Sequence, residues 1–389
     1  MHQHSIIMGN IPLGKFFFLR LENAFLLAEK GDIFELLSDY DNLENDLLSW
    51  CNFKGEKFLE KTKINNSFAY KMLKNSSTKF HAFDPKLSIA PLENGLSARG
   101  AKLENASPHY HFNLSVKDEI WSDNVSKIYQ ESKSSQWNAS TDIAWHDIPK
   151  YNPSLEFAIA QIMTYLVENE FSALYIPSKF LPTISPFYHE VPLLLSSVIG
   201  DEARHIEVFI KRANATGLGL QYSTLTTQQS LYTLYKEQDY LKSSFLLHIM
   251  GEGTFMDLLS FLENYAQDEP TKNLLRLARK DEGRHVAYGM GHVKSAISNN
   301  PKRIELLKDA VFRRKHYLDE LSGESSLLLE SLALFAGGGD SASNFSFGFE
   351  AVEDLKQKME KNRTKRLVEC GIDEDLAHDM SKSHTPNFM

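Results

Sequence analysis

The chain has 389 residues, of which 42% are hydrophobic and 24% charged, proportions that are ordinary for a globular protein with a sizeable core. Its 42 Lys and Arg residues against 51 Asp and Glu residues give a net charge of −9, which argues against a dedicated nucleic-acid-binding protein. The two cysteines, Cys51 and Cys370, are too few for a cysteine-rich zinc site, an iron–sulfur site or a disulfide framework, so a reducing compartment fits. Any metal in this protein is therefore expected to have oxygen and nitrogen ligands.

The N-terminal segment 1–27 is mildly apolar but lacks a basic start, an unbroken apolar core and a small-residue cleavage site, so a signal peptide is not predicted. No uninterrupted apolar stretch reaches the length of about 18 residues that a membrane span needs. These observations predict a cytoplasmic protein without a membrane-embedded segment.

The first third of the chain mixes helical and irregular patterns. Apolar residues recur three and four positions apart over residues 14–75, which predicts helices there, the last near residues 58–74. Residues 76–117 are rich in Ser, Asn, Pro and Gly and predict a loop region with a hairpin. A short helix is expected near residues 117–133.

Helical patterns dominate from residue 151 onward. The predicted helices cover residues 153–175, 188–215, 225–236, 236–267, 271–299, 302–321, 324–336 and 348–370. Pro177 is expected to end or kink the first of these helices, and Gly371 is a suitable cap after the last. We therefore divide the chain into an N-terminal helical and loop region (1–135), a central helical bundle (136–300) and a C-terminal helical extension (301–389).

One short motif occurs twice within the central region. Residues 201–205 read Asp-Glu-Ala-Arg-His and residues 281–285 read Asp-Glu-Gly-Arg-His. Each contains a Glu-x-x-His pair, whose two side chains lie on one face of a helix and can bind one metal ion. Two such pairs, with one more glutamate from each of two other helices, form a dinuclear carboxylate site in a four-helix bundle.

Suitable extra glutamates precede both motifs. Glu170 and Glu252 each lie in an otherwise apolar helical stripe, whereas the neighbours of Glu168 are more mixed. An inward carboxylate needs a compensating cation because its desolvation costs several kcal/mol. Four carboxylates and two neutral imidazoles would neutralise two divalent ions, and this oxygen-rich set suits iron or manganese better than zinc.

The spacing indicates two similar helical hairpins. Glu170 precedes Glu202 by 32 residues, and Glu252 precedes Glu282 by 30. Each hairpin is expected to carry a bridging glutamate on its first arm and a Glu-x-x-His pair on its second.

The doubled Asp-Glu-x-Arg-His motif, with a glutamate some thirty residues before each copy, resembles the ferritin-like di-iron carboxylate oxygenases and oxidases over about residues 137–295. It is similar to the large subunits of bacterial multicomponent monooxygenases and to the p-aminobenzoate N-oxygenase family. The resemblance implies an all-α fold, a ferritin-like four-helix bundle with additional N- and C-terminal helices, and a dinuclear metal site within residues 136–300. It implies two Fe ions as the cofactor, with Mn/Fe or two Mn as alternatives. The implied ligands are Glu170, Glu202, His205, Glu252, Glu282 and His285.

The same resemblance implies a supporting set around the ligands. Asp201 would orient His285 and Asp281 would orient His205, while Arg204 and Arg284 would pair with these aspartates. This agrees with a general rule, because a metal-bound imidazole donates its second N–H to a carboxylate. A structural salt-bridge network is the alternative for these four residues.

Two positions depart from the relatives' patterns. The monooxygenases carry a Thr where this chain has Met256, and the N-oxygenases carry an additional His ligand where it has Ala278. His248, one turn before Glu252, is a candidate to support the site, against the simpler interpretation of a structural histidine. Gly251 and Gly253 flank Glu252 and favour a local helical bulge, a feature common at functional sites.

These features predict an O₂-activating oxidoreductase acting on a small apolar or aromatic substrate by hydroxylation, N-oxygenation or desaturation. A separate protein would donate electrons, because the sequence has no flavin fingerprint and no iron–sulfur cysteines. A homodimer stays open, and the alternative function is iron handling without oxygenase activity. Weaker candidates are His292 and, for the pocket wall, a set of aromatic residues: Tyr165, Phe171, Tyr175, Phe245, Phe255 and Tyr288.

Overall fold

The computed structural model describes residues 2–319 and 326–384. The chain separates into two compact units, one formed by Met1–Leu87 and Pro91–Tyr110 and the other by Ser88–Ala90 and His111–Met389. Each unit has its own hydrophobic core.

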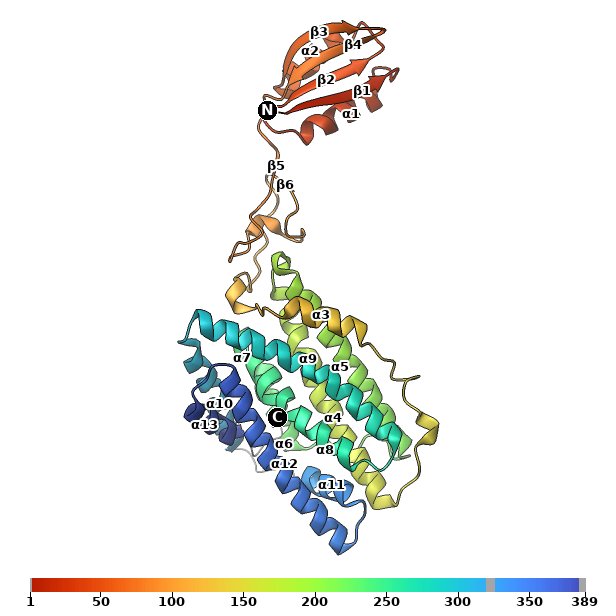
Figure 1. Cartoon of the computed structure of the whole chain (residues 1–389), viewed down its shortest axis with the longest axis vertical. Coiled ribbons are helices and arrows are strands. Elements are labelled where there is room, and N and C mark those ends of the chain that lie inside the picture. The colour runs from red at the N-terminus through yellow and green to blue at the C-terminus, as the bar shows by residue number, and fades with distance from the viewer. Residues whose placement is uncertain (1, 320–325, 385–389) are drawn as a thin grey trace. The chain divides into compact units, whose positions relative to one another are not determined.

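The first unit contains a four-stranded mixed sheet with two helices (Figure 1). Strands β1 and β2 are parallel, and β4 pairs antiparallel with both β2 and β3, which gives the order β1-β2-β4-β3. Its core joins one face of the sheet to buried residues of the helices, such as Phe17 and Leu47. The elements are β1 (Gln3–Gly9), α1 (Lys15–Leu26), β2 (Ile33–Ser38), α2 (Glu44–Lys54), β3 (Lys57–Ile64) and β4 (Ser67–Leu73).

The all-helical prediction for residues 14–75 is wrong in this unit. Helices α1 and α2 exist, but residues 33–38, 57–64 and 67–73 are strands. Along β2, buried residues alternate with half-buried ones, which is the period of a strand rather than of a helix. Asn65 adopts a positive φ of 53° in the tight turn between β3 and β4, a conformation that asparagine tolerates.

The loop region after this sheet contains one short antiparallel strand pair, whose strands are separated by residues 82–102, rather than a tight hairpin. Its strands β5 (Phe80–His81) and β6 (Leu103–Glu104) pair antiparallel over two residues each.

The second unit is helical and confirms the predicted ferritin-like four-helix bundle (Figure 1). Helices α4 and α5 form one hairpin, and the second consists of the composite helix α7–η6–α8 followed by α9. The bounds are α3 (Val125–Ser134), α4 (Pro153–Phe180), α5 (Glu190–Ala215), α6 (Leu225–Lys236), α7 (Tyr240–Ser244), η6 (Phe245–Glu252), α8 (Gly253–Tyr265), α9 (Glu269–Asn299), α10 (Arg303–Asp319), α11 (Ser326–Gly337), α12 (Ala342–Glu369) and α13 (Glu374–His384).

Local sequence signals set most of these boundaries. The Asn152 side chain accepts a hydrogen bond from the Leu155 amide at the start of α4, and Asp268 caps α9 in the same way. Helix α4 continues through Pro177 to Phe180, a few residues beyond the predicted end. Helix α12 starts before its predicted first residue, and the predicted ends at residues 321 and 324 lie outside the described residues.

The third bundle helix is long and strongly apolar. Residues Tyr240–Tyr265 are long and apolar enough to cross a membrane, with a mean hydropathy of 1.3, but 89% of that stretch is buried inside the protein. Its apolarity therefore follows from its place in the bundle core, between α9 and α12.

Candidate metal centre

Four bundle segments bring the six predicted ligands together. Glu170 comes from α4, Glu202 and His205 from α5, Glu252 from the end of η6, and the second Glu-x-x-His pair from α9. All six side chains are buried, none more than 3% exposed. The pair on α9 consists of Glu282 and His285.

The six residues form two overlapping clusters, each able to hold one ion. The first contains Glu170 and His205 and the second contains Glu252 and His285, while Glu202 and Glu282 belong to both. His205 Nδ1 lies 3.4 Å from one oxygen of Glu202, and His285 Nδ1 lies 2.9 Å from its other oxygen.

This arrangement corrects the predicted bridging pattern. The glutamates of the Glu-x-x-His pairs, rather than those on the first arms, are shared between the clusters. Glu282 likewise directs one oxygen toward His205 at 3.3 Å and the other toward His285 at 3.4 Å. Because α5 and α9 each carry a histidine beside a shared glutamate, the two clusters are related by an approximate twofold symmetry.

The atoms that would bind the ions have no hydrogen-bond partners although they are buried. They are Glu170 Oε1, both carboxylate oxygens of Glu202 and of Glu282, Glu252 Oε1, and the Nδ1 atoms of His205 and His285. Leaving so many buried polar atoms unsatisfied is costly, so the cluster is suited to cations.

The electrostatics of the cluster point the same way. Burial and the neighbouring charge of Glu202 raise the pKa of Glu170 well above its usual value, and burial also raises the pKa of Glu252. Burial acts to raise the pKa of Glu202, but the charge of His285 and the contacts with His205, His285 and Glu170 together lower it. The nearby carboxylates raise the pKa of both histidines against burial. Protons therefore compete with metal ions for this site.

The structure also brings together the four residues expected to support the ligands. His205 Nε2 lies 3.1 Å from Asp281, and His285 Nε2 lies 3.4 Å from Asp201, so each aspartate contacts the histidine of the opposite motif. Arg204 donates to both aspartates, at 2.5 Å to Asp201 and 2.7 Å to Asp281, and Arg284 also contacts both. The histidine Nε2 atoms thus face carboxylates and the Nδ1 atoms face the cluster.

Two residues before the bundle complete this network, and the sequence analysis assigned neither a role. Trp137 Nε1 donates to Asp281 Oδ2 at 2.7 Å, and its ring stacks on His205. Gln136 donates to Asp201 and accepts from Arg204. Both residues lie in an irregular segment, and the one available signal was the position of Trp137 at the start of the family resemblance.

His248 supports Glu252 and belongs to neither ligand cluster. Its Nδ1 lies 2.6 Å from Glu252 Oε2, which leaves Oε1 facing His285. The segment that carries both residues, η6, is a π-helix, so the local bulge predicted from Gly251 and Gly253 is present. His248 and Glu252 are four positions apart, so their side chains meet on one side of this helix.

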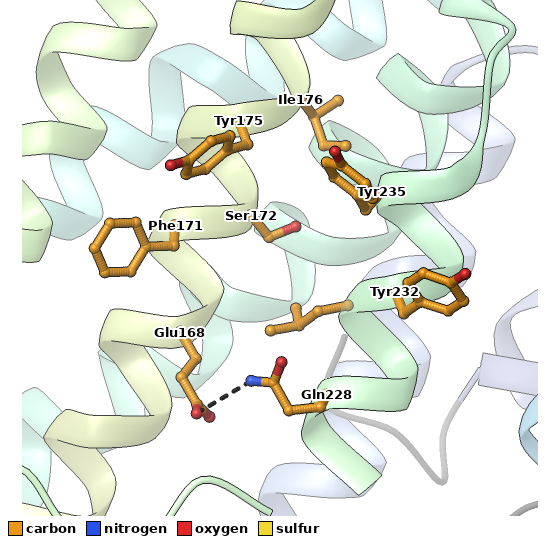
Figure 2. Close-up of a pocket in the computed structure, with 9 residues that line it drawn as sticks. Glu168, Phe171, Ser172, Tyr175, Ile176, Gln228, Tyr232 and Tyr235 are labelled. Carbon is orange, nitrogen blue, oxygen red and sulfur yellow. Dashed lines mark hydrogen bonds between the residues drawn. The ribbon is translucent and has the colours of Figure 1, made fainter. Parts of the chain in front are cut away.

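The weaker candidates lie elsewhere. His292 bonds to Ser244 at 3.0 Å and to the Glu119 carbonyl at 2.8 Å, and it does not contact the cluster. Phe171 and Tyr175 line a pocket on the other side of α4 (Figure 2). The other predicted wall residues are buried in the bundle: Tyr165, Phe245, Phe255 and Tyr288.

Comparison with known proteins places this fold. No family model matches the chain, and no curated protein matches it either. Solved structures of R2-like ligand-binding oxidases do match: a variant with an Fe/Fe cofactor gives a TM-score of 0.53 at 16% identity, covering 65% of this chain and 95% of that chain. A variant with an Mn/Fe cofactor gives 0.52, with the same identity and coverage. At this identity the likeness establishes the fold, a ferritin-like four-helix bundle.

Proposed function

We propose that this protein is a dinuclear non-haem metalloenzyme that activates O₂ to oxidise a small apolar or aromatic molecule. One observation carries the proposal: buried, unpartnered oxygen and nitrogen atoms of six residues converge in two clusters that share Glu202 and Glu282. The similar solved R2-like ligand-binding oxidases, which carry Fe/Fe and Mn/Fe cofactors, support it.

The donor set fits two divalent ions in number and charge. Four carboxylates carry four negative charges, which balance two M²⁺ ions, and each cluster supplies one imidazole nitrogen. Carboxylate ligands with some imidazole suit iron and manganese, so two Fe ions are proposed, with Mn/Fe or two Mn as the alternatives. When bound, this metal pair would supply the electrons and the coordination positions for O₂ reduction.

The chain's own residues would hold the site rigid and dry. Asp281 and Asp201 fix the tautomers of the two histidines, because each accepts the Nε2 proton and leaves Nδ1 free for an ion. His248 holds one oxygen of Glu252 and so directs the other toward the second cluster. Burial of all six ligands keeps bulk water away from the reacting atoms.

Substrate and partners follow from the same reasoning. Hydroxylation, N-oxygenation and desaturation all fit a metal pair in an apolar bundle. A separate protein is proposed as the electron donor, since Cys51 and Cys370 are both buried and far apart in the sequence. We place the protein in the cytoplasm, with neither nucleic acid nor a membrane as a partner, and a homodimer is compatible with this function.

The proposal is tested by loading the purified protein with Fe²⁺ without oxygen and then admitting O₂. Two iron ions per chain and a transient near-ultraviolet or visible absorption band are expected. Glu282→Ala removes a ligand shared by both clusters and should abolish tight binding of both ions, whereas the control Glu207→Ala alters an exposed residue paired with Lys211 and should bind two. Full metal content in Glu282→Ala would contradict the ligand assignment. Continued iron uptake beyond two per chain would favour iron handling instead.

A further inference from the structure

A pocket separate from the metal centre lies between α4 and α6 (Figure 2). Its volume is about 340 Å³, which is enough for a small molecule. It lies on the other side of α4 from Glu170, because Phe171 and Tyr175 are 43% and 55% exposed where Glu170 is buried. The lining residues are Glu168, Phe171, Ser172, Tyr175, Ile176, Gln228, Leu231, Tyr232 and Tyr235.

Aromatic rings from both helices dominate this lining. Phe171 and Tyr175 come from α4, and Tyr232 and Tyr235 come from α6, so both helices contribute aromatic side chains to the lining (Figure 2). Such ring faces attract cations through their negative quadrupole. Two lysines of the chain already make such contacts. The Lys179 ammonium lies 5.7 Å from the Tyr235 ring centre, and the Lys236 ammonium lies 5.2 Å from the Tyr232 ring centre.

The pocket contains one charged residue, the half-buried Glu168. Its carboxylate accepts a hydrogen bond of 3.2 Å from Gln228 Nε2, drawn as a dashed line in Figure 2. Among the described residues, no Lys, Arg or His forms an ion pair with Glu168, whose hydrogen-bond partners are the neutral Gln228 and Ser223. The nearby Lys179 instead donates to the carbonyls of Tyr235 and Glu237.

One polar atom in the wall has no hydrogen-bond partner. Ser172 Oγ is buried and accepts or donates no hydrogen bond, although it stands between Glu168 and Tyr175 along the pocket side of α4 (Figure 2). The pocket therefore combines aromatic side chains, one carboxylate that forms no ion pair and one unsatisfied hydroxyl.

From this combination we infer that the pocket binds a small organic cation, a substituted or quaternary ammonium with an apolar body. The rings contact the alkyl groups around the positive nitrogen, and Glu168 balances its charge. A neutral molecule of the same shape gains the apolar contacts alone, and an anion is repelled by the carboxylate. This inference is independent of the metal centre, because none of the lining residues is a proposed ligand.

Choline and its neutral carbon isostere 3,3-dimethylbutan-1-ol are matched probes, since they differ by one positive charge. Binding to the full-length protein is measured by saturation-transfer NMR and calorimetry, with and without added iron. Choline is expected to bind in both conditions, about tenfold more tightly than the isostere, the difference expected for a cation–π contact with a partly desolvated charge. Equal binding of both probes, or binding of neither, would overturn the inference.

Variants locate the site. Glu168→Gln keeps the shape and should weaken choline at least fivefold while leaving the isostere unchanged, and Tyr235→Leu should weaken choline by a similar factor. The controls are Glu207→Gln and Tyr222→Leu, which alter an exposed acid and an exposed tyrosine outside the lining. Metal content and thermal midpoint verify that each variant is folded. Choline binding that is unaffected by Glu168→Gln and Tyr235→Leu would refute the site. The site would also be refuted if choline did not bind and the chain instead self-associated through this pocket, with Tyr235→Leu abolishing the self-association.

Discussion

Replacing Asp281 by Asn tests how the ligands are held in place. Asp281 is 1% exposed and accepts hydrogen bonds from His205 Nε2, Trp137 Nε1 and Arg204 Nη2 at 3.1, 2.7 and 2.7 Å. These contacts, which include the charged Arg204, hold the pKa of Asp281 below its usual value despite burial. The amide of Asn carries no charge, and its NH₂ group cannot accept a hydrogen bond.

The size of the effect follows from these contacts. Removing one partner from a buried charged network costs about 3–5 kcal/mol. The cost should be smaller here, because Arg204 and Arg284 keep their ion pairs with Asp201. We therefore expect Asp281→Asn to lower the free energy of unfolding of the metal-free protein by about 2–3 kcal/mol. Loss of the carboxylate behind a ligating histidine lowers metal affinity by about 10–100-fold.

The affinity loss should fall on one of the two ions. His205 belongs only to the first cluster, so Asp281→Asn should weaken one ion and leave the other close to wild type. The mirror variant Asp201→Asn should weaken the other ion by a smaller factor, because its contact with His285 is longer, at 3.4 Å. Anaerobic Fe²⁺ titration followed by calorimetry measures both affinities, and denaturant unfolding measures stability. Two unchanged affinities in a folded Asp281→Asn protein would refute this reasoning.

Three further predictions concern packing, pH and metal. A methyl group at Gly289 would collide with His248 Cβ, so Gly289→Ala should lower the free energy of unfolding by about 1–3 kcal/mol and weaken metal binding, as denaturant unfolding and metal analysis would show. Burial lowers the pKa of His292 from 6.5 to about 4, so as the pH falls the unfolded chain binds a proton at this histidine before the folded chain does. The free energy of unfolding should therefore fall by about 3 kcal/mol as the pH drops from 6.5 to 4. His292→Gln should flatten this pH dependence of the free energy of unfolding, and an unchanged dependence would show that His292 is not its cause. Iron at about 1,000 times its dissociation constant should raise stability by about 4 kcal/mol for each bound ion, and a chelator should reverse the rise in thermal midpoint.

The sequence was most informative where chemistry and helical geometry constrain each other. A carboxylate in an apolar stripe, as at Glu170 or Glu252, is costly to bury unless something neutralises it, so its position alone indicates a special site. The Glu-x-x-His spacing then fixes which neighbours share a helical face. These two rules predicted the bundle and the six residues that the structure brings together.

Features that depend on contacts between distant segments were not predictable in the same way. Which glutamates are shared between the clusters depends on side-chain directions across four helices, so helical spacing alone predicted the wrong pair. Trp137 reaches Asp281 across 144 positions of sequence, and no local pattern marks such a contact. The strands of the first unit were missed because short apolar segments, such as residues 33–38, fit both helical and strand periods.

Anomalous diffraction at the iron absorption edge, from crystals of the iron-loaded protein, would locate the bound ions. Two peaks about 3.5–4 Å apart are expected, one beside His205 Nδ1 and one beside His285 Nδ1, with Glu202 and Glu282 lying between them. A single peak, or peaks away from these six residues, would contradict the proposed dinuclear site.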